Sequence, residues 1–267
     1  GRLIRFERPI GTLLLLWPTY WALWIAAQGF PRWKLLIIFS LGTFLMRSAG
    51  CAINDIADRK VDGHVERTKL RPLATGAISV KEALAVFGGL LLGAFILVLQ
   101  LNTLTLLFSG VAVLLAATYP FMKRYHHWPQ VYLGLAFAWG IPMAFTAIND
   151  QFPPLVAWIL LAANVAWTTA YDTMYAMCDR EDDLKIGVKS TAIIFGEHDR
   201  LIVGCLQVLT LALLIWVGFL AGLKVWFWLS LVVVAGFFIY QQYLIRNRDR
   251  WLSLRAFLNN NWVGLVV

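Results

Sequence analysis

Two clusters of acidic residues are the part of this sequence best suited to chemistry. In the first, three polar residues at i, i+4 and i+8 share one helical face, with a further carboxylate beside them: Asn54, Asp58, Asp62 and Asp55. In the second, three carboxylates at i, i+7 and i+11 share a face: Asp172, Asp179 and Asp183. Like charges this close repel each other and destabilise a helix, so each cluster requires a compensating charge.

A divalent cation between the clusters would relieve this repulsion. The side chains are all oxygen donors, with no histidine or cysteine among them, which favours a hard ion and Mg²⁺ above all. Mg²⁺ takes only one or two carboxylates and completes its shell with water and phosphate oxygens. Two facing clusters would therefore suit more than one Mg²⁺ ion bridging a diphosphate. The alternative interpretation is a pair of solvated, acidic helix ends.

Basic residues follow both clusters closely. Diphosphate oxygens are best met by arginine forks and lysine ammonium groups. We expect substrate contacts from four residues that flank the acidic faces or begin a loop: Arg67, Arg71, Lys123 and Arg180. For any one of them, the general excess of positive charge in cytoplasmic loops is the competing explanation.

Arg47 lies inside an apolar run, about two turns before Asn54. A charge within the membrane is costly and by default faces the bundle interior or a polar cavity. Arg47 could pair with a carboxylate of the protein, or it could bind an anionic substrate deep in a cavity.

The composition excludes a soluble protein. Of the 267 residues, 60% are hydrophobic and 14% are charged, against about 25% charged residues in an ordinary soluble domain. This balance rules out a cytosolic globular enzyme, a disulfide scaffold and a disordered chain. The net charge of +8 would suit nucleic acid, but in a membrane protein it reflects basic cytoplasmic loops, so the expected partner is the lipid bilayer and no nucleic acid.

Nine apolar runs approach or exceed the roughly 20 residues that a membrane-spanning helix needs. They predict an all-α polytopic membrane bundle of nine transmembrane helices, the last of them incomplete. The runs cover 9–28, 35–53, 82–100, 103–121, 130–148, 153–177, 201–222, 225–244 and the residues from 253 onward.

The basic residues orient this bundle. Nineteen of the 23 Lys and Arg residues lie on one side of the predicted membrane, and only Arg32, Lys34 and Lys224 lie on the other. Arg47 is inside the second span. Because cytoplasmic loops carry the excess of Lys and Arg, the N-terminus and both acidic clusters are expected to be cytoplasmic.

The two acidic clusters resemble the motifs of the UbiA-type intramembrane prenyltransferases. In that family, an N-D-x-x-D-x-x-x-D pattern follows the second helix and a D-x-x-x-D pattern follows the sixth. Asn54, Asp55, Asp58 and Asp62 match the first pattern, and Asp179 and Asp183 match the second. Four segments further resemble the 4-hydroxybenzoate polyprenyltransferase branch of the family: 50–55, 119–124, 171–176 and 258–264.

The resemblance implies helices around a central cavity and a Mg²⁺-dependent aromatic prenyltransferase. Its substrates would be polyprenyl diphosphate and 4-hydroxybenzoate, which is alkylated at the ring carbon ortho to the hydroxyl. The products would be 3-polyprenyl-4-hydroxybenzoate and diphosphate, in ubiquinone biosynthesis. Protein partners are not indicated.

The resemblance also assigns roles to residues. Metal and diphosphate binding would fall to five carboxylates: Asp55, Asp58, Asp62, Asp179 and Asp183. Asn54 would be a polar ligand or would orient one. Arg47 would bind the benzoate carboxylate, and Asp172 or Tyr175 would orient the phenol or help to accept the ring proton.

We expect residues 1–267 to form a single transmembrane prenyltransferase domain, truncated at both ends, in the bacterial inner membrane. Two alternatives stay open. One keeps the superfamily but changes the acceptor. The other is a secondary transporter, whose site would lie near the membrane midplane on broken helices, whereas these clusters lie at the cytoplasmic ends of helices.

Overall fold

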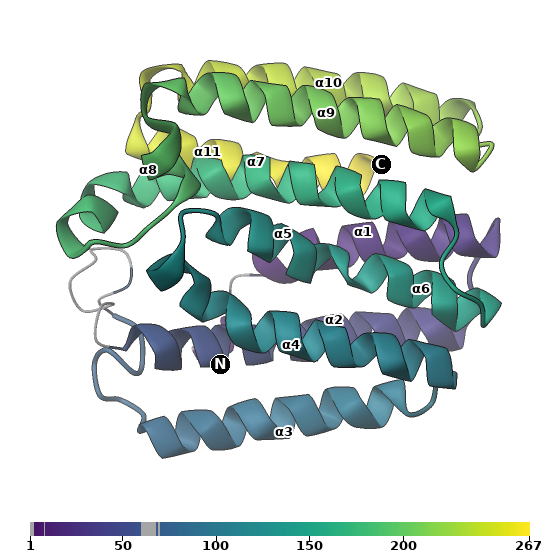
Figure 1. Cartoon of the computed structure of the whole chain (residues 1–267), viewed down its shortest axis with the longest axis horizontal. Helices are drawn as coiled ribbons and strands as arrows, with labels where there is room; N and C mark the ends of the chain where they lie inside the picture. Colours follow the sequence, from purple (N-terminus) through teal and green to yellow (C-terminus); the bar gives the residue numbers. More distant parts are fainter. Residues whose placement is uncertain (1–2, 8, 60–67, 69) are drawn as a thin grey trace.

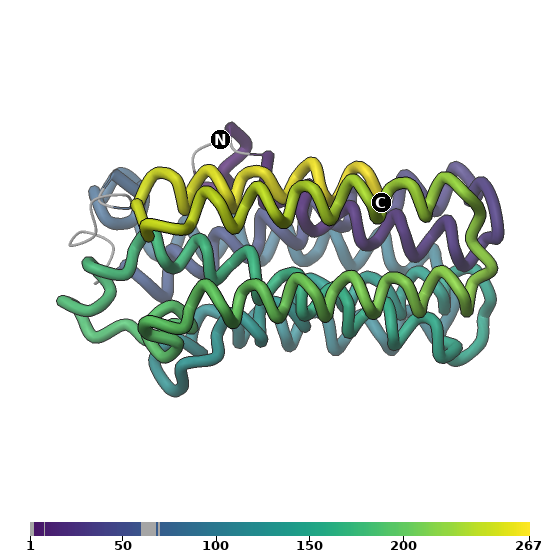
Figure 2. The backbone as a smooth tube through the Cα atoms, turned by 90° about the horizontal axis from the view of Figure 1, so that it is seen from above, coloured from purple at the N-terminus to yellow at the C-terminus, as the bar shows by residue number. Residues whose placement is uncertain are grey.

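The computed structural model describes residues 3–7, 9–59, 68 and 70–267, and all regular elements in these ranges are helical. The long helices run side by side, with their connections at the two ends of the bundle (Figure 1, Figure 2). The elements are α1 (Ile10–Ala27), α2 (Trp33–Asp58), α3 (Val80–Val98), α4 (Thr103–Tyr125), α5 (Pro129–Ala138), α6 (Gly140–Asn149), α7 (Leu155–Ile186), α8 (Thr191–Phe195), η2 (Gly196–His198), α9 (Asp199–Leu220), α10 (Val225–Leu244), η3 (Ile245–Asn247) and α11 (Arg250–Val266).

Eight segments of the described chain are long and apolar enough to cross a membrane. They coincide with the first eight predicted runs. Helix α11 has 17 residues and corresponds to the ninth predicted run. The prediction of an all-α membrane bundle is confirmed, and the protein is an integral membrane protein.

The fifth span is two helices rather than one continuous helix. Helices α5 and α6 are separated at Trp139. Pro142 explains the break, because proline has no N–H to donate to the carbonyl of Ala138 and its ring clashes with that carbonyl. At Gly140, a Cβ atom would lie 2.5 Å from Oγ1 of Thr19, so the absence of a side chain lets α6 pack tightly on α1.

Helices α2 and α7 are longer than the membrane core. Their 26 and 32 residues correspond to about 39 and 48 Å, against a hydrocarbon thickness of about 30 Å. Helix α7 ends only at Gly187, which adopts a left-handed conformation (φ +71°) and donates its N–H to the carbonyl of Asp183. Both acidic ends therefore extend beyond the apolar core, at the same end of the bundle (Figure 1).

Helix α11 is tied to three other helices by consecutive asparagines at 259–261. The first accepts a hydrogen bond from Gln241 of α10 (2.9 Å), the second from the Trp167 indole of α7 (2.8 Å), and the third from the Trp17 indole of α1 (3.0 Å). Successive residues of a helix point about 100° apart, so one turn reaches three neighbours. These bonds fix α11 against α1, α7 and α10.

Candidate active site

A cavity of about 1240 Å³ lies among the helices, with both acidic clusters at one end. Asp55 and Asp58 line it from α2, and Asp179 and Asp183 line it from α7. Its opposite end is apolar and includes Ile38. Because Ile38 and Asp55 belong to the same helix, the cavity extends for about 26 Å along α2. The structure thus brings together carboxylates that are more than 100 residues apart in the sequence.

The carboxylates of α2 are almost completely buried and are paired with three basic side chains. Arg5 Nη2 lies 2.9 Å from Asp55 Oδ1, and Arg71 Nη1 lies 3.3 Å from the same oxygen. Lys123 Nζ lies 2.5 Å from Asp58 Oδ2. An unpaired buried charge would cost several kcal/mol, and these basic residues supply the compensating positive charge beside the carboxylates.

Arg5 is a site residue that the sequence did not single out. It precedes the first span and has no distinctive spacing from the acidic motifs, so it counted only as cytoplasmic positive charge. Burial lowers its pKa, but the nearby side chains of Cys51 and Asp55 outweigh that effect and raise the pKa above its ordinary value. Arg5 therefore stays charged, and only the folded position of segment 3–7 over α2 reveals its role.

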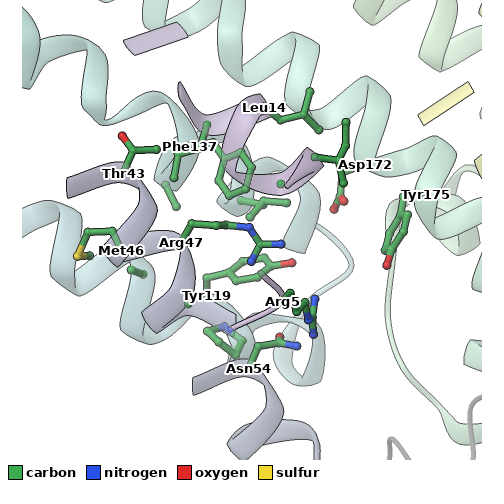
Figure 3. A pocket seen from close by; sticks show the side chains of 18 of the residues that line it. Arg5, Leu14, Thr43, Met46, Arg47, Asn54, Tyr119, Phe137, Asp172 and Tyr175 are labelled. Carbon is green, nitrogen blue, oxygen red and sulfur yellow. The ribbon is translucent and has the colours of Figure 1, made fainter. Parts of the chain in front are cut away.

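Arg47 lines the cavity about two turns of α2 deeper than Asp55. Its guanidinium lies beside Tyr119 (Figure 3). Its Nη1 donates to Cys51 Sγ at 2.7 Å, and its buried Nε has no hydrogen-bond partner among the described residues. Gly11 makes room for it, since a Cβ at position 11 would lie 2.5 Å from Nε. No ion pair between Arg47 and a protein carboxylate occurs in the described chain. Its guanidinium therefore remains suited to an anionic ligand.

Three further polar side chains surround this deeper part of the cavity. Asp172 and Tyr175 come from α7, and Tyr119 comes from α4 beside Arg47 (Figure 3). The Tyr175 ring packs against Phe257 of α11, with 4.7 Å between ring centroids. Tyr119 was missed as a candidate, although it lies in a segment that carried the family resemblance. Asn54 also lines the cavity, as predicted for a site residue.

The second cluster is less buried than the first. Arg250 Nη2 lies 2.8 Å from Asp182 Oδ2 and 3.9 Å from Asp179 Oδ1. Asp182 does not line the cavity, whereas Asp179 and Asp183 do. Of these three neighbouring carboxylates, the two that match the family motif thus line the cavity, together with Asp172 deeper on the same helix.

Arg180 is not among the residues that line the cavity, contrary to the expectation that it binds substrate. It lies one position round α7 from Asp179, and Nη1 instead lies 3.1 Å from Asp199 Oδ2. Its sequence neighbourhood suggested the cavity, but the 100° step between adjacent helical residues turns it away. Lys189, which the sequence did not single out, lines the cavity instead. Two other expected site residues, Asp62 and Arg67, lie outside the described residues.

The donor set fits Mg²⁺. The carboxylates and the Asn54 amide offer only oxygen as ligands from this face, and Asp58 Oδ1 is buried without a hydrogen bond among the described residues. No three His, Cys, Asp or Glu side chains of the described chain gather around one point. Mg²⁺ itself takes only one or two protein carboxylates per ion and completes its shell with water and phosphate oxygens.

The UbiA prenyltransferase family matches residues 15–263 of this sequence. The chain belongs to the UbiA prenyltransferase family. Two proteins named 4-hydroxybenzoate octaprenyltransferase are similar to it over 266 residues: that of Chromohalobacter salexigens is 61% identical and that of Vibrio parahaemolyticus is 58% identical. These matches cover 100% of this chain, and 89% and 93% of the two relatives.

Solved structures of UbiA homologues have the same fold. The apo homologue from Aeropyrum pernix K1 aligns with a TM-score of 0.85 at 26% identity, covering 96% of this chain and 94% of its own. A homologue from Archaeoglobus fulgidus, bound to GPP and Mg²⁺, aligns with a TM-score of 0.77 at 19% identity over 100% of both chains. The predicted family and fold are confirmed, and this UbiA-family chain is a membrane enzyme of the prenyltransferase class.

Binding of Mg²⁺ with inorganic diphosphate should stabilise the wild-type protein. Ligand at 100 times its Kd contributes about 2.7 kcal/mol, enough to raise the melting temperature by several degrees in detergent. Asp55→Asn should remove most of that rise, because it deletes a carboxylate at the acidic end of the cavity, which we call its mouth. Asp150→Asn, an exposed position of the loop after α6, is the matched control and should retain it. A full rise in Asp55→Asn would contradict the metal assignment.

Proposed function

We propose that this chain transfers a polyprenyl group from polyprenyl diphosphate to 4-hydroxybenzoate, at the ring carbon ortho to the hydroxyl. The proposal rests on one observation. A single cavity is lined by the two acidic clusters at one end, by Arg47 at greater depth, and by apolar side chains at the opposite end. The acceptor is supported by the names of relatives that are 57–61% identical over essentially the whole chain. Residues 1–267 would act as a single transmembrane prenyltransferase domain.

The polar mouth is suited to the diphosphate. Bound Mg²⁺, held by Asp55, Asp58, Asp179 and Asp183 with Asn54 beside them, would neutralise charge on the leaving diphosphate. Arg5, Arg71 and Lys123 already lie within 4 Å of the α2 carboxylates, so they can turn from these to diphosphate oxygens without long movements. Asp62 and Arg67 remain proposals from the sequence for the same roles.

The deeper cavity is suited to the acceptor and to the reactive carbon. When the C–O bond of the allylic diphosphate breaks, its carbon takes on cationic character that water would quench. Apolar lining side chains keep water away. Arg47 would bind the benzoate carboxylate, which aims the ring at the allylic carbon. A new C–C bond forms ortho to the phenol, and the proton of that ring carbon leaves toward Asp172 or Tyr175.

A transporter is disfavoured by the two helices that carry the acids. Helices α2 and α7 run without interruption for 26 and 32 residues. Transporter sites are typically formed where helices break near the midplane. Among the spans that the structure describes, the one that breaks is the fifth, between α5 and α6 and away from the acidic ends.

The proposed function predicts product formation in membranes that contain the wild-type protein. With octaprenyl diphosphate, 4-hydroxybenzoate and Mg²⁺, mass spectrometry should detect 3-octaprenyl-4-hydroxybenzoate, and a chelator should abolish it. Asp179→Asn should lower turnover by about 100-fold or more, since it removes charge stabilisation at the leaving group. Glu181→Gln, an exposed position on the same helix, should remain active. Absence of product in the wild type would refute the proposal.

Arg47→Leu should weaken binding of the acceptor selectively. Loss of a charge-assisted hydrogen bond of about 1.5–3 kcal/mol corresponds to a roughly 10- to 100-fold higher KM for 4-hydroxybenzoate. The KM for octaprenyl diphosphate should change by less than about twofold, because the diphosphate binds nearer the mouth. An unchanged KM for 4-hydroxybenzoate would exclude Arg47 from the acceptor site.

The 19-to-3 distribution of basic residues further supports a bacterial inner-membrane protein with a cytoplasmic N-terminus and cytoplasmic acidic clusters. In a Cys205→Ser background, Glu197→Cys and Lys224→Cys place single reporters on exposed positions at opposite ends of α9 and its flanking turns. A membrane-impermeant maleimide added to intact spheroplasts should label position 224 and not 197. The reverse pattern would invert the proposed orientation.

A further inference from the structure

The carboxylate of Asp199 is fully buried where α9 begins, and two arginines hold it. Arg180 Nη1 lies 3.1 Å from Oδ2, and Arg248 Nε donates to both carboxylate oxygens at 3.0 and 3.1 Å. The backbone N–H of Arg200 donates to Oδ1 at 2.7 Å. The hydrogen bonds from Arg248 to Asp199 raise the pKa of Arg248 above its ordinary value. The charge is thus fully compensated inside the protein.

The same two guanidinium groups also hold the main chain that connects α7 to α9. Arg180 Nη2 donates to the carbonyls of Ala192 and Gly196 at 2.5 and 2.8 Å. Arg248 Nη2 donates to the carbonyl of Glu197 at 2.6 Å. Because main-chain carbonyls are the acceptors, the cluster fixes the path of the connection rather than particular side chains.

The preceding part of the connection is attached to helices α4 and α5. Lys189 N–H donates to the carbonyl of Lys123 at 3.2 Å, and Lys189 Nζ donates to the carbonyl of Tyr125 at 3.2 Å. Thr191 N–H donates to Gln130 Oε1 at 3.0 Å. Residues 188–190, which line the cavity at its acidic end, thus contain one of these anchors and directly precede the carbonyls at 192–197 that Arg180 and Arg248 hold.

We propose that Asp199, held by Arg180 and Arg248, positions the α7–α9 connection so that Lys189 stands at the mouth of the cavity and meets the diphosphate. Asp199, Arg180 and Arg248 are positioning residues that act through Lys189. The inference rests on the proposed function. A lysine ammonium on a flexible stem has no preset direction, so its use depends on where its main chain is held.

The position of Arg180 links this cluster to the acidic site. Asp179 faces the cavity, and Arg180, next to it on the same turn, faces the connection. One turn of α7 therefore sets both the second acidic cluster and the anchor of the segment that carries Lys189. A shift of that turn would therefore displace the second acidic cluster and Lys189 together.

Two arginines two positions apart provide a matched pair of variants. Arg248→Gln removes contacts to Asp199 and to the Glu197 carbonyl, whereas Arg246→Gln removes only a side chain that stacks on Tyr243. Arg248→Gln should raise the KM for octaprenyl diphosphate by about fivefold or more, and leave the KM for 4-hydroxybenzoate within about twofold. Arg246→Gln should match the wild type. Equal KM values for octaprenyl diphosphate in the two variants would overturn the proposal.

A double-mutant cycle separates positioning from a general loss of structure. If Arg248 acts through Lys189, then Lys189→Gln with Arg248→Gln should bind octaprenyl diphosphate no more weakly than Lys189→Gln alone. Multiplicative effects on this KM would overturn the proposal. Should Arg248→Gln fail to accumulate in membranes, Arg248→Lys replaces it in the same double-mutant cycle. This variant keeps the positive charge but cannot contact Asp199 and the Glu197 carbonyl with two separate N–H groups of a guanidinium. Failure of the proposed function would show separately, as a wild type that forms no product.

Discussion

The burial of Asp55 and Asp58 at the end of a membrane cavity is the constraint on which the rest of the site depends. Two carboxylates in such a place repel each other and lose hydration, so cations must lie against them in every state of the protein. Arg5, Arg71 and Lys123 meet that need from three different parts of the chain. The same requirement explains why metal ions with a diphosphate would bind strongly there. Affinity for the substrate head and stability of the fold thus share one electrostatic origin.

Depth in the cavity separates the chemical tasks. Charged groups gather at the mouth, Arg47 and its polar neighbours lie below them, and the remaining lining is apolar. Helix α2 contributes to all three levels, with Asp55, Arg47 and Ile38 at successive heights. One uninterrupted helix therefore sets the spacing between the parts of the cavity that we propose for the leaving group, the acceptor and the prenyl tail. A break in α2 would disturb that spacing, whereas the break between α5 and α6 leaves it intact.

Local patterns explain what the sequence could predict. Each span is visible as an apolar run, and the two acidic clusters are visible because helical spacing alone places their members on one face. The break in the fifth span was also available locally, since Pro142 lies inside the apolar run. The roles of Arg5 and Arg180 could not be read in this way. Arg5 depends on where segment 3–7 lies over α2, and Arg180 depends on a partner, Asp199, supplied by another helix. Such pairings follow from tertiary packing, and no spacing in the sequence encodes them.

The three asparagines of α11 have a consequence for how the bundle is assembled. Their partners on α1, α7 and α10 all precede α11 in the chain, so they are synthesised before it. Until α11 inserts, the indole N–H groups of Trp17 and Trp167 lack these two acceptors. Insertion of α11 satisfies them in a single turn. The packing of α11 against α1, α7 and α10 thus follows the synthesis of all three, and it links helices that are far apart in the sequence in one late step of assembly.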